Sequence, residues 1–274
     1  MLRPFRQIDV FTDVPYAGNP VAVVLDGDGL DDDAMRRFAR WTNLSETTFV
    51  LPPTNPEADY RVRIFTTTME LPFAGHPTLG TCHAWLAAGG SPRRPDVTVQ
   101  ECPAGLVPVR RTPAGLAFAA PPQRRSGPVD DGLVAEITAA FGMASDAVLA
   151  AEWVDNGPGW LALLLDSADA VLAVRPRYVD QFVGLVGPHR AGSPCAVEVR
   201  AFVPERGAMT EDPATGSLNA SVAQWLIGAG RLAAPYVASQ GTVLGRSGRV
   251  HVTADDDLWI GGGTITCIEG TVDL

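Results

Sequence analysis

Three side chains in this sequence are candidates for proton transfer: Glu46, His76 and Asp212. Glu46 stands between the expected end of a helix at Asn43 and a strand that starts at Thr47, with apolar residues on both sides. A carboxyl group in such surroundings has its neutral form favoured, which moves its pKa toward the range useful for acid–base catalysis at neutral pH. The alternative is a structural glutamate that is solvated or ion-paired at the strand end.

His76 and Asp212 belong to two segments that resemble each other. The repeated unit is a strand, a loop and a helix with a tryptophan: 62–65, 75–81 and Trp85 in the first copy, and 199–202, 211–217 and Trp225 in the second. The offset is 137 at the strand, 136 at the loop proline and 140 at the tryptophan, close to half of the 274 residues. The repeat predicts two related halves with His76 and Asp212 in matching places. It also predicts about one extra helical turn in the second helix.

Each loop is expected to lead into a helix N-terminus, where unpaired backbone N–H groups and the helix dipole favour an anion. Glycines there let the backbone approach a ligand, and hydroxyl groups can donate to it. We expect such contacts with a small carboxylate from Gly75, Gly80, Thr81, Thr215, Gly216 and Ser217. An ordinary helix cap is the alternative, because Asp212 before Pro213 has the pattern of an N-cap and a first helical residue.

The remaining elements are mostly strands separated by Gly and Pro. Helices are expected near 31–43, 77–88, 133–141 and 217–226, and strands at 8–12, 21–25, 47–51, 60–65, 97–101, 106–110, 116–119, 148–154, 160–165 and 196–202, with three more after the last helix. Strand-rich halves with one well-buried helix each predict an α+β fold. The proline-rich stretch 121–128 predicts a linker between domains at 1–122 and 129–274, with the last strand able to return to the first domain.

Composition excludes several classes of protein. The net charge of −10, with no Lys/Arg block, argues against a nucleic-acid partner. No segment has the apolar length of a secretory signal or membrane span, so we expect a cytoplasmic protein without a membrane partner. The four cysteines and four histidines lack metal-ligand spacing, and residues 261–263 lack the context of a nucleotide fingerprint. We therefore expect neither a metal nor a cofactor.

The sequence resembles the PhzF-like family, which includes phenazine-biosynthesis PhzF and shares the diaminopimelate epimerase fold. The similar stretches follow one another along nearly the whole chain and are highly specific together. They are Asp9–Thr12, Gly18–Pro20, Asn43–Thr47, Glu70–Gly80, Glu211–Ser217 and Gln240–Gly241.

The resemblance implies two similar domains, each a curved or barrel-like sheet around a central helix, with the active site between them and a homodimer as the usual assembly. It implies a cofactor-independent isomerase of secondary-metabolite biosynthesis that acts on a small cyclic carboxylate, a dihydro-hydroxyanthranilate in the family's phenazine enzyme. By motif, Glu46 moves a hydrogen between ring carbons, while His76, Asp212 and Ser217 bind and orient the substrate and assist proton transfer. Leu218 departs from the family's common alanine and is expected to reshape the pocket floor.

Two rival functions remain open at this point. One is an amino-acid epimerase that uses Glu46 and Asp212 as opposed bases. Related two-base epimerases carry a cysteine in each loop, which this sequence lacks. The other is a non-catalytic ligand-binding or protein-interaction member of the family, because binding pockets also use carboxylates.

Overall fold

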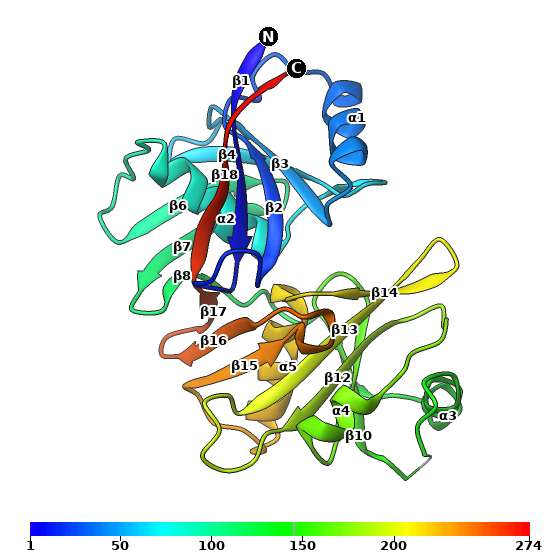
Figure 1. The fold of residues 1–274 in the computed structure, drawn as a ribbon. Coiled ribbons are helices and arrows are strands. Elements are labelled where there is room, and N and C mark those ends of the chain that lie inside the picture. Colours follow the sequence, from blue (N-terminus) through cyan, green and yellow to red (C-terminus); the bar gives the residue numbers. More distant parts are fainter. Residues whose placement is uncertain (145) are drawn as a thin grey trace. The chain divides into compact units, whose positions relative to one another are not determined.

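The computed structural model describes residues 1–144 and 146–274, which form two compact units. Unit 1 comprises residues 1–119 and 261–274, and unit 2 comprises residues 120–260. The two chain ends meet in unit 1, where the Met1 amino group lies 2.6 Å from both the Leu274 carbonyl oxygen and the Asp273 carboxylate (Figure 1).

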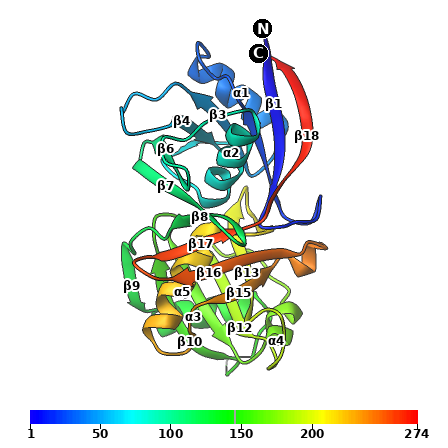
Figure 2. The same ribbon diagram turned by 90° about the vertical axis from the view of Figure 1, so that its left-hand side faces the viewer.

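Unit 1 wraps strands around one helix. Its strands are β1 (Leu2–Val10), β2 (Asn19–Val24), β3 (Glu46–Leu51), β4 (Tyr60–Phe65), β5 (Glu70–Leu71), β6 (Val97–Cys102), β7 (Gly105–Thr112), β8 (Gly115–Ala119) and β18 (Thr264–Asp273), and its helices are α1 (Asp32–Thr42) and α2 (Gly75–Ala87). Helix α2 packs against β1, β2, β3, β8 and β18, and Figures 1 and 2 show it enclosed by these strands. Because α2 is buried on most sides, it has no strong polar face.

Unit 2 is built in the same way around α5. Its strands are β9 (Arg125–Pro128), β10 (Val148–Asp155), β11 (Trp160–Leu165), β12 (Phe182–Pro188), β13 (Val197–Glu205), β14 (Ala208–Asp212), β15 (Tyr236–Gln240) and β16 (Gly248–Ala254), and its helices are α3 (Asp131–Ala140), α4 (Ala168–Ala173), α5 (Gly216–Gly228) and the 3₁₀ turn η1 (Thr242–Leu244). Strand β17 (Leu258–Gly262) runs from unit 2 into unit 1.

The two units repeat one strand topology. In unit 1, β1–β2, β3–β4 and β6–β7 are antiparallel, whereas β2–β3 and β4–β6 are parallel. Unit 2 repeats this order with β10–β11, β12–β13 and β15–β16 antiparallel and with β11–β12 and β13–β15 parallel. The predicted α+β fold of two similar halves is therefore confirmed.

Local signals place α1 as expected. The Asp31 carboxylate accepts a hydrogen bond from the Ala34 N–H at 2.7 Å, and Asn43 ends the helix in the left-handed conformation with φ of 55°. Met35, Phe38 and Ala39 form the buried face of this helix. The stretch 121–128, expected to be a linker, is partly a strand. Its residues 125–128 form β9, which pairs with β10.

Matching Arg–Glu ion pairs show which residues of the two units correspond. In unit 1, Arg63 grips Glu70 through Nε and Nη2 at 2.7 and 2.6 Å. In unit 2, Arg200 grips Glu211 through the same atoms at 3.0 and 2.7 Å. The arginines are 137 positions apart and the glutamates 141. The four extra residues therefore lie in the β13–β14 hairpin.

The predicted insertion inside the second helix is wrong, because α2 and α5 both contain 13 residues. The offset of 141 holds from Glu70 through the helices, so His76 corresponds to Ser217. The expected match of His76 with Asp212 is also wrong, because Asp212 stands where unit 1 has Leu71.

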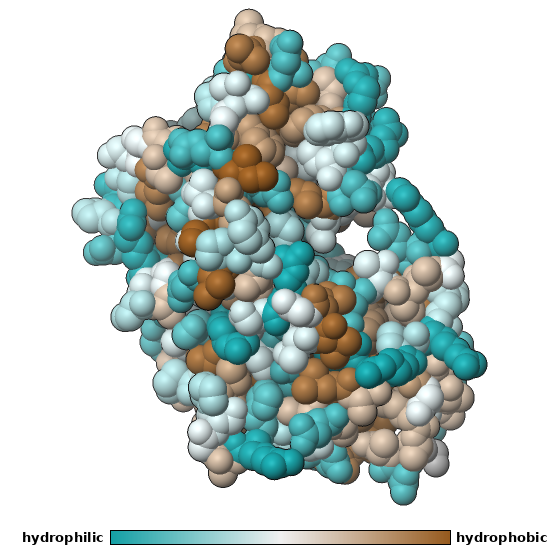
Figure 3. Space-filling model, in the orientation of Figure 1, coloured by the Kyte–Doolittle hydropathy of each residue, from teal (hydrophilic) through white to brown (hydrophobic). Residues whose placement is uncertain are grey.

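Polar residues dominate much of the surface. On the face drawn in Figure 3, hydrophilic residues are interspersed with several smaller apolar areas. Trp41 and Ile268 of unit 1 are among the exposed apolar side chains, at 79% and 49% exposure.

Candidate active site

The two central helices begin without a side-chain cap. Ala74 precedes α2 and Thr215 precedes α5, and neither side chain bonds to the first-turn N–H groups. The first N–H groups of a helix have no partner within the helix, so both ends can accept an anion. The N-cap interpretation of Asp212 is wrong, because α5 begins only at Gly216.

Glu46 and His76 meet inside unit 1. Glu46 is the first residue of β3 and His76 is the second residue of α2, and both elements are parts of the same barrel. Their Oε2 and Nε2 atoms lie 3.3 Å apart, with side-chain exposures of 15% and 6%. The structure thus brings together the predicted acid–base residue and one of its predicted helpers.

Burial sets the charge of His76. Desolvation lowers the pKa of its imidazole from 6.5 to about 3, although a hydrogen bond with the Pro20 backbone acts in the opposite direction. The neighbouring carboxylate favours the cation, but the penalty for burying a charge is larger at this low exposure. His76 is consequently neutral at physiological pH.

Asn19 is a site residue that the sequence interpretation missed. Its Nδ2 lies 3.3 Å from Nδ1 of His76. The Pro20 carbonyl oxygen accepts from the ring as well, so Asn19 and Pro20 together orient the imidazole. The available signal was the Gly18-Asn19-Pro20 turn, which was noted only as part of the family resemblance.

A carboxylate in β1 holds this turn. Oδ2 of Asp9 accepts from the Gly18 N–H at 3.0 Å. Gly18 is required for the close approach, since a Cβ at that position would lie 2.2 Å from the Val10 carbonyl oxygen. The turn therefore delivers Asn19 to His76 from a well-anchored strand.

In unit 2 the predicted residues form a tight network. Oδ2 of Asp212 accepts from the Thr215 hydroxyl at 2.5 Å. Gln240 holds the same loop, accepting from the Thr215 N–H at 3.0 Å and donating to the Asp212 carbonyl oxygen at 3.0 Å. Gln100 has the matching place in unit 1, where it donates to the Thr78 hydroxyl at 2.9 Å.

Two expected ligand contacts are instead packing residues. A Cβ on Gly80 would lie 2.3 Å from Val21, so this glycine lets α2 pack against β2. Thr81 is fully buried and its hydroxyl lies 2.8 Å from that of Thr48. Leu218 is also fully buried and fits against Gly184 of β12, so it faces the sheet and not an open pocket floor.

Neither helix start, at residues 75–78 or 216–219, contains a cysteine that could act as a catalytic thiol. Cys82 lies on α2, but it is fully buried and desolvation raises its pKa to about 11. Among the described residues, no cluster of three His, Cys, Asp or Glu could hold a metal ion. No helix in that part of the chain is long and apolar enough to cross a membrane.

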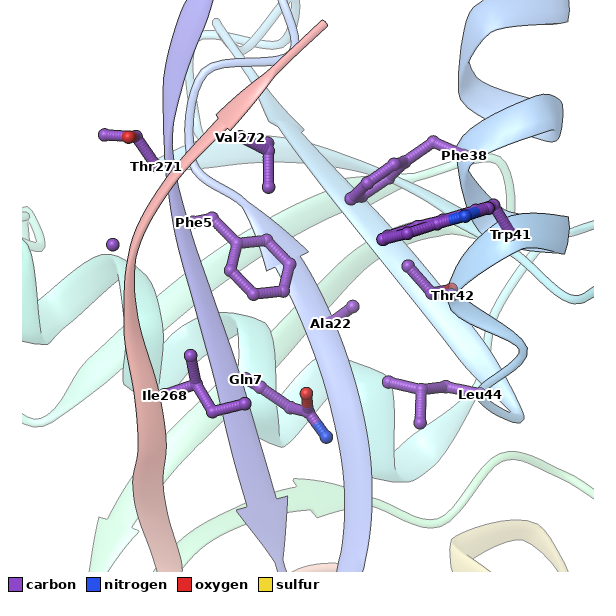
Figure 4. A pocket seen from close by; sticks show the side chains of 11 residues that line it. Phe5, Gln7, Ala22, Phe38, Trp41, Thr42, Leu44, Ile268, Thr271 and Val272 are labelled. Carbon is purple, nitrogen blue, oxygen red and sulfur yellow. The ribbon is translucent and has the colours of Figure 1, made fainter.

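Unit 1 also contains a pocket that is separate from the Glu46–His76 pair. It lies between α1 and strands β1, β2 and β18, and Figure 4 shows Phe5, Phe38, Trp41 and Leu44 around it. Its lining carries no ionisable side chain and includes neither Glu46 nor His76. It therefore lacks the groups needed for proton transfer.

Comparison with known proteins places the chain in a family. A family model described as phenazine biosynthesis-like protein matches residues 8–270. Trans-2,3-dihydro-3-hydroxyanthranilate isomerase of Pseudomonas fluorescens is 36% identical over 254 residues, covering 90% of this chain and 89% of the relative. Antisense-enhancing sequence 1 of Schizosaccharomyces pombe is 34% identical over 290 residues, covering 97% of each.

A solved structure shows the same fold. The PhzF-family phenazine biosynthesis protein of Bacillus anthracis matches with a TM-score of 0.83 and 21% identity over 100% of both chains. The family match over residues 8–270 and the 36% identity to the Pseudomonas fluorescens isomerase show that the chain belongs to the PhzF-like family of isomerases.

Proposed function

We propose that this isomerase moves a proton between two carbons of a small cyclic carboxylate, with Glu46 as the group that takes up and returns the proton. The observation that carries the proposal is the 3.3 Å approach of the partly buried Glu46 carboxylate to the neutral His76 ring. Relatives named as dihydro-hydroxyanthranilate isomerases support the substrate class.

Glu46 supplies the proton chemistry. Its carboxylate accepts a proton from a substrate C–H next to an unsaturated or carbonyl group, and the electron pair left on carbon is delocalised into that group. The protonated Glu46 then returns the proton to another carbon of the same molecule. Atoms and charge balance without a co-reactant. A positioned acid–base group of this kind contributes about 10² to 10⁴-fold to the rate.

His76 serves as a neutral polar group in this scheme. A neutral imidazole next to the Glu46 carboxylate can stabilise negative charge that develops beside it. A cationic His76 would bind the Glu46 carboxylate more strongly and weaken it as a base. The low pKa of His76, which burial causes, therefore suits the reaction.

The start of α5 in unit 2 offers groups that suit a carboxylate. Gly216 and Ser217 open α5 with free N–H groups, matching Gly75 and His76 at the start of α2. Asp212, held by the Thr215 hydroxyl, would accept from a substrate amine or hydroxyl. Gly75, Thr215, Gly216 and Ser217 thus stay in the proposed binding set, whereas Gly80 and Thr81 leave it.

The test uses a Glu46→Gln variant, which keeps the side-chain size and removes the base. Turnover of trans-2,3-dihydro-3-hydroxyanthranilate should fall by about 10² to 10⁴-fold, while binding of anthranilate, which cannot react, stays within about twofold. Glu57→Gln is the matched control, because Glu57 is exposed in a loop. Full turnover by the Glu46 variant would refute the proposal. Racemisation of a chiral amino acid by the wild type would favour the epimerase alternative.

A further inference from the structure

In unit 2, a phenylalanine stands where unit 1 has Glu46, and a tryptophan lies beside it on the neighbouring strand. Strands β11 and β12 pair Trp160 with Phe182 as β2 and β3 pair Val21 with Glu46. Phe182 thus takes the place of Glu46, and Ser217 takes that of His76. The two rings are 5.2 Å apart and meet edge to face at 89°, and Trp160 is only 2% exposed.

Trp160 fixes the direction of the Ser217 hydrogen bond. Its indole Nε1 donates to Oγ of Ser217 at 3.1 Å. An indole N–H can only donate, so the serine oxygen must accept and its own hydrogen points elsewhere. Within residues 1–144 and 146–274, no acceptor for that hydrogen is found, and Ser217 is only partly buried.

The surrounding bonds hold the serine in this state. The Ser217 carbonyl oxygen already accepts from Nδ2 of Asn156 at 2.8 Å and from the Ser221 hydroxyl at 3.1 Å. The backbone is therefore anchored on one side and the hydroxyl on the other. What Ser217 offers to a ligand is one O–H donor beside the N–H groups that open α5.

We propose that Trp160 is a positioning residue that fixes Ser217 as a hydrogen-bond donor to a carboxylate oxygen of the substrate. This inference rests on the proposed function and adds a positioning residue to it. Glu46 lies beside the start of α2, whereas the first two residues of α5 present hydrogen-bond donors. A carboxylate fits such a donor set because it accepts hydrogen bonds without donating any.

The test is a double-mutant cycle on ligand binding. Calorimetry would measure anthranilate, and aniline as the analogue without a carboxylate, against wild type, Trp160→Phe, Ser217→Ala and the double variant. Each single variant should weaken anthranilate binding by about ten- to a hundredfold, the range expected for one hydrogen bond to a charged group. The double variant should bind no more weakly than Ser217→Ala alone, because Trp160 acts through the serine. Aniline binding should not change.

Two controls separate this role from packing. Trp259→Phe removes another indole hydrogen bond in unit 2, the one from Nε1 to Asp255 at 3.0 Å, and should leave anthranilate affinity unchanged. If Trp160→Phe folds poorly, replacement of Trp160 by benzothienylalanine keeps the ring shape and removes only the donor. That protein should show the same loss of affinity.

Three results would overturn the inference: no anthranilate binding by the wild type, an unchanged affinity in the Trp160 variants, or fully additive losses in the cycle. Failure of the proposed function is distinguishable, because it would show as full turnover by Glu46→Gln while the binding cycle keeps its outcome.

Discussion

Glu46 and His76 are 30 positions apart in the sequence, yet Oε2 of one lies 3.3 Å from Nε2 of the other within unit 1. The start of β3 and the start of α2 meet at this point, and Asn19 from the start of β2 approaches the other ring nitrogen of His76. Glu46 thus lies beside an imidazole whose pKa burial lowers to about 3, so the imidazole is uncharged at neutral pH.

The buried neutral His76 should make stability depend on pH. Its pKa is about 3 in the folded protein against 6.5 for an unperturbed histidine, so the folded state binds fewer protons between these values. Stability is then complete above pH 6.5 and is lost as the pH falls toward 3, at up to about 1.4 kcal/mol per pH unit. Urea unfolding at pH 7 and pH 5 should show wild type losing about 2 kcal/mol more than His76→Gln. Equal losses would contradict a buried neutral imidazole.

Asn19 should matter for rate more than for binding. Replacing it by alanine removes the amide beside Nδ1 of His76, so the imidazole loses one of the partners that orient it. Loss of such an orienting partner is expected to lower kcat about tenfold, with KM changed by less than about twofold. The matched control is Asn55→Ala, in the loop before β4, which should retain wild-type kcat. A normal kcat in Asn19→Ala would show that the amide does not orient His76.

The local elements were predictable because their signals are local. Asp31 and Asn43 mark both ends of α1, and alternating β-branched residues mark β4. Strand β12 was missed because Gly184 and Gly187 interrupt its apolar pattern. Both glycines are needed for packing: a Cβ would lie 2.6 Å from Leu218 at the first and 2.3 Å from the Ser167 carbonyl oxygen at the second.

Most residues of the site were predictable from the sequence, but the residue-by-residue correspondence between the two units was not. The two loops were matched on Pro77 and Pro213, which hid the longer β13–β14 hairpin. The two Arg–Glu pairs show which residues of the two units correspond. In each pair, however, the arginine and the glutamate are brought together by a β-hairpin, and residue spacing alone does not reveal that pairing. Trp160 escaped notice for a related reason, since its partner Ser217 is 57 positions away.

Two helical glycines should respond oppositely to alanine. Gly80→Ala places a methyl group 2.3 Å from Val21 in the wall around α2, so overpacking should cost about 1 to 3 kcal/mol of unfolding free energy. Gly228→Ala, at the end of α5, meets nothing within 4 Å and should stabilise by up to about 1 kcal/mol. Urea unfolding measures both changes. A stable Gly80→Ala protein that loses substrate affinity would restore Gly80 to the binding set.

Proton transfer by Glu46 is tested most directly by turnover in D2O. After wild-type enzyme has converted trans-2,3-dihydro-3-hydroxyanthranilate, NMR and mass spectrometry would locate any deuterium in the product. Exchange of protonated Glu46 with solvent predicts deuterium at the carbon that receives the proton, and a rate of incorporation reduced by about 10² to 10⁴-fold in Glu46→Gln. Incorporation at the wild-type rate in the Glu46→Gln variant would contradict the assignment of Glu46 as the proton carrier.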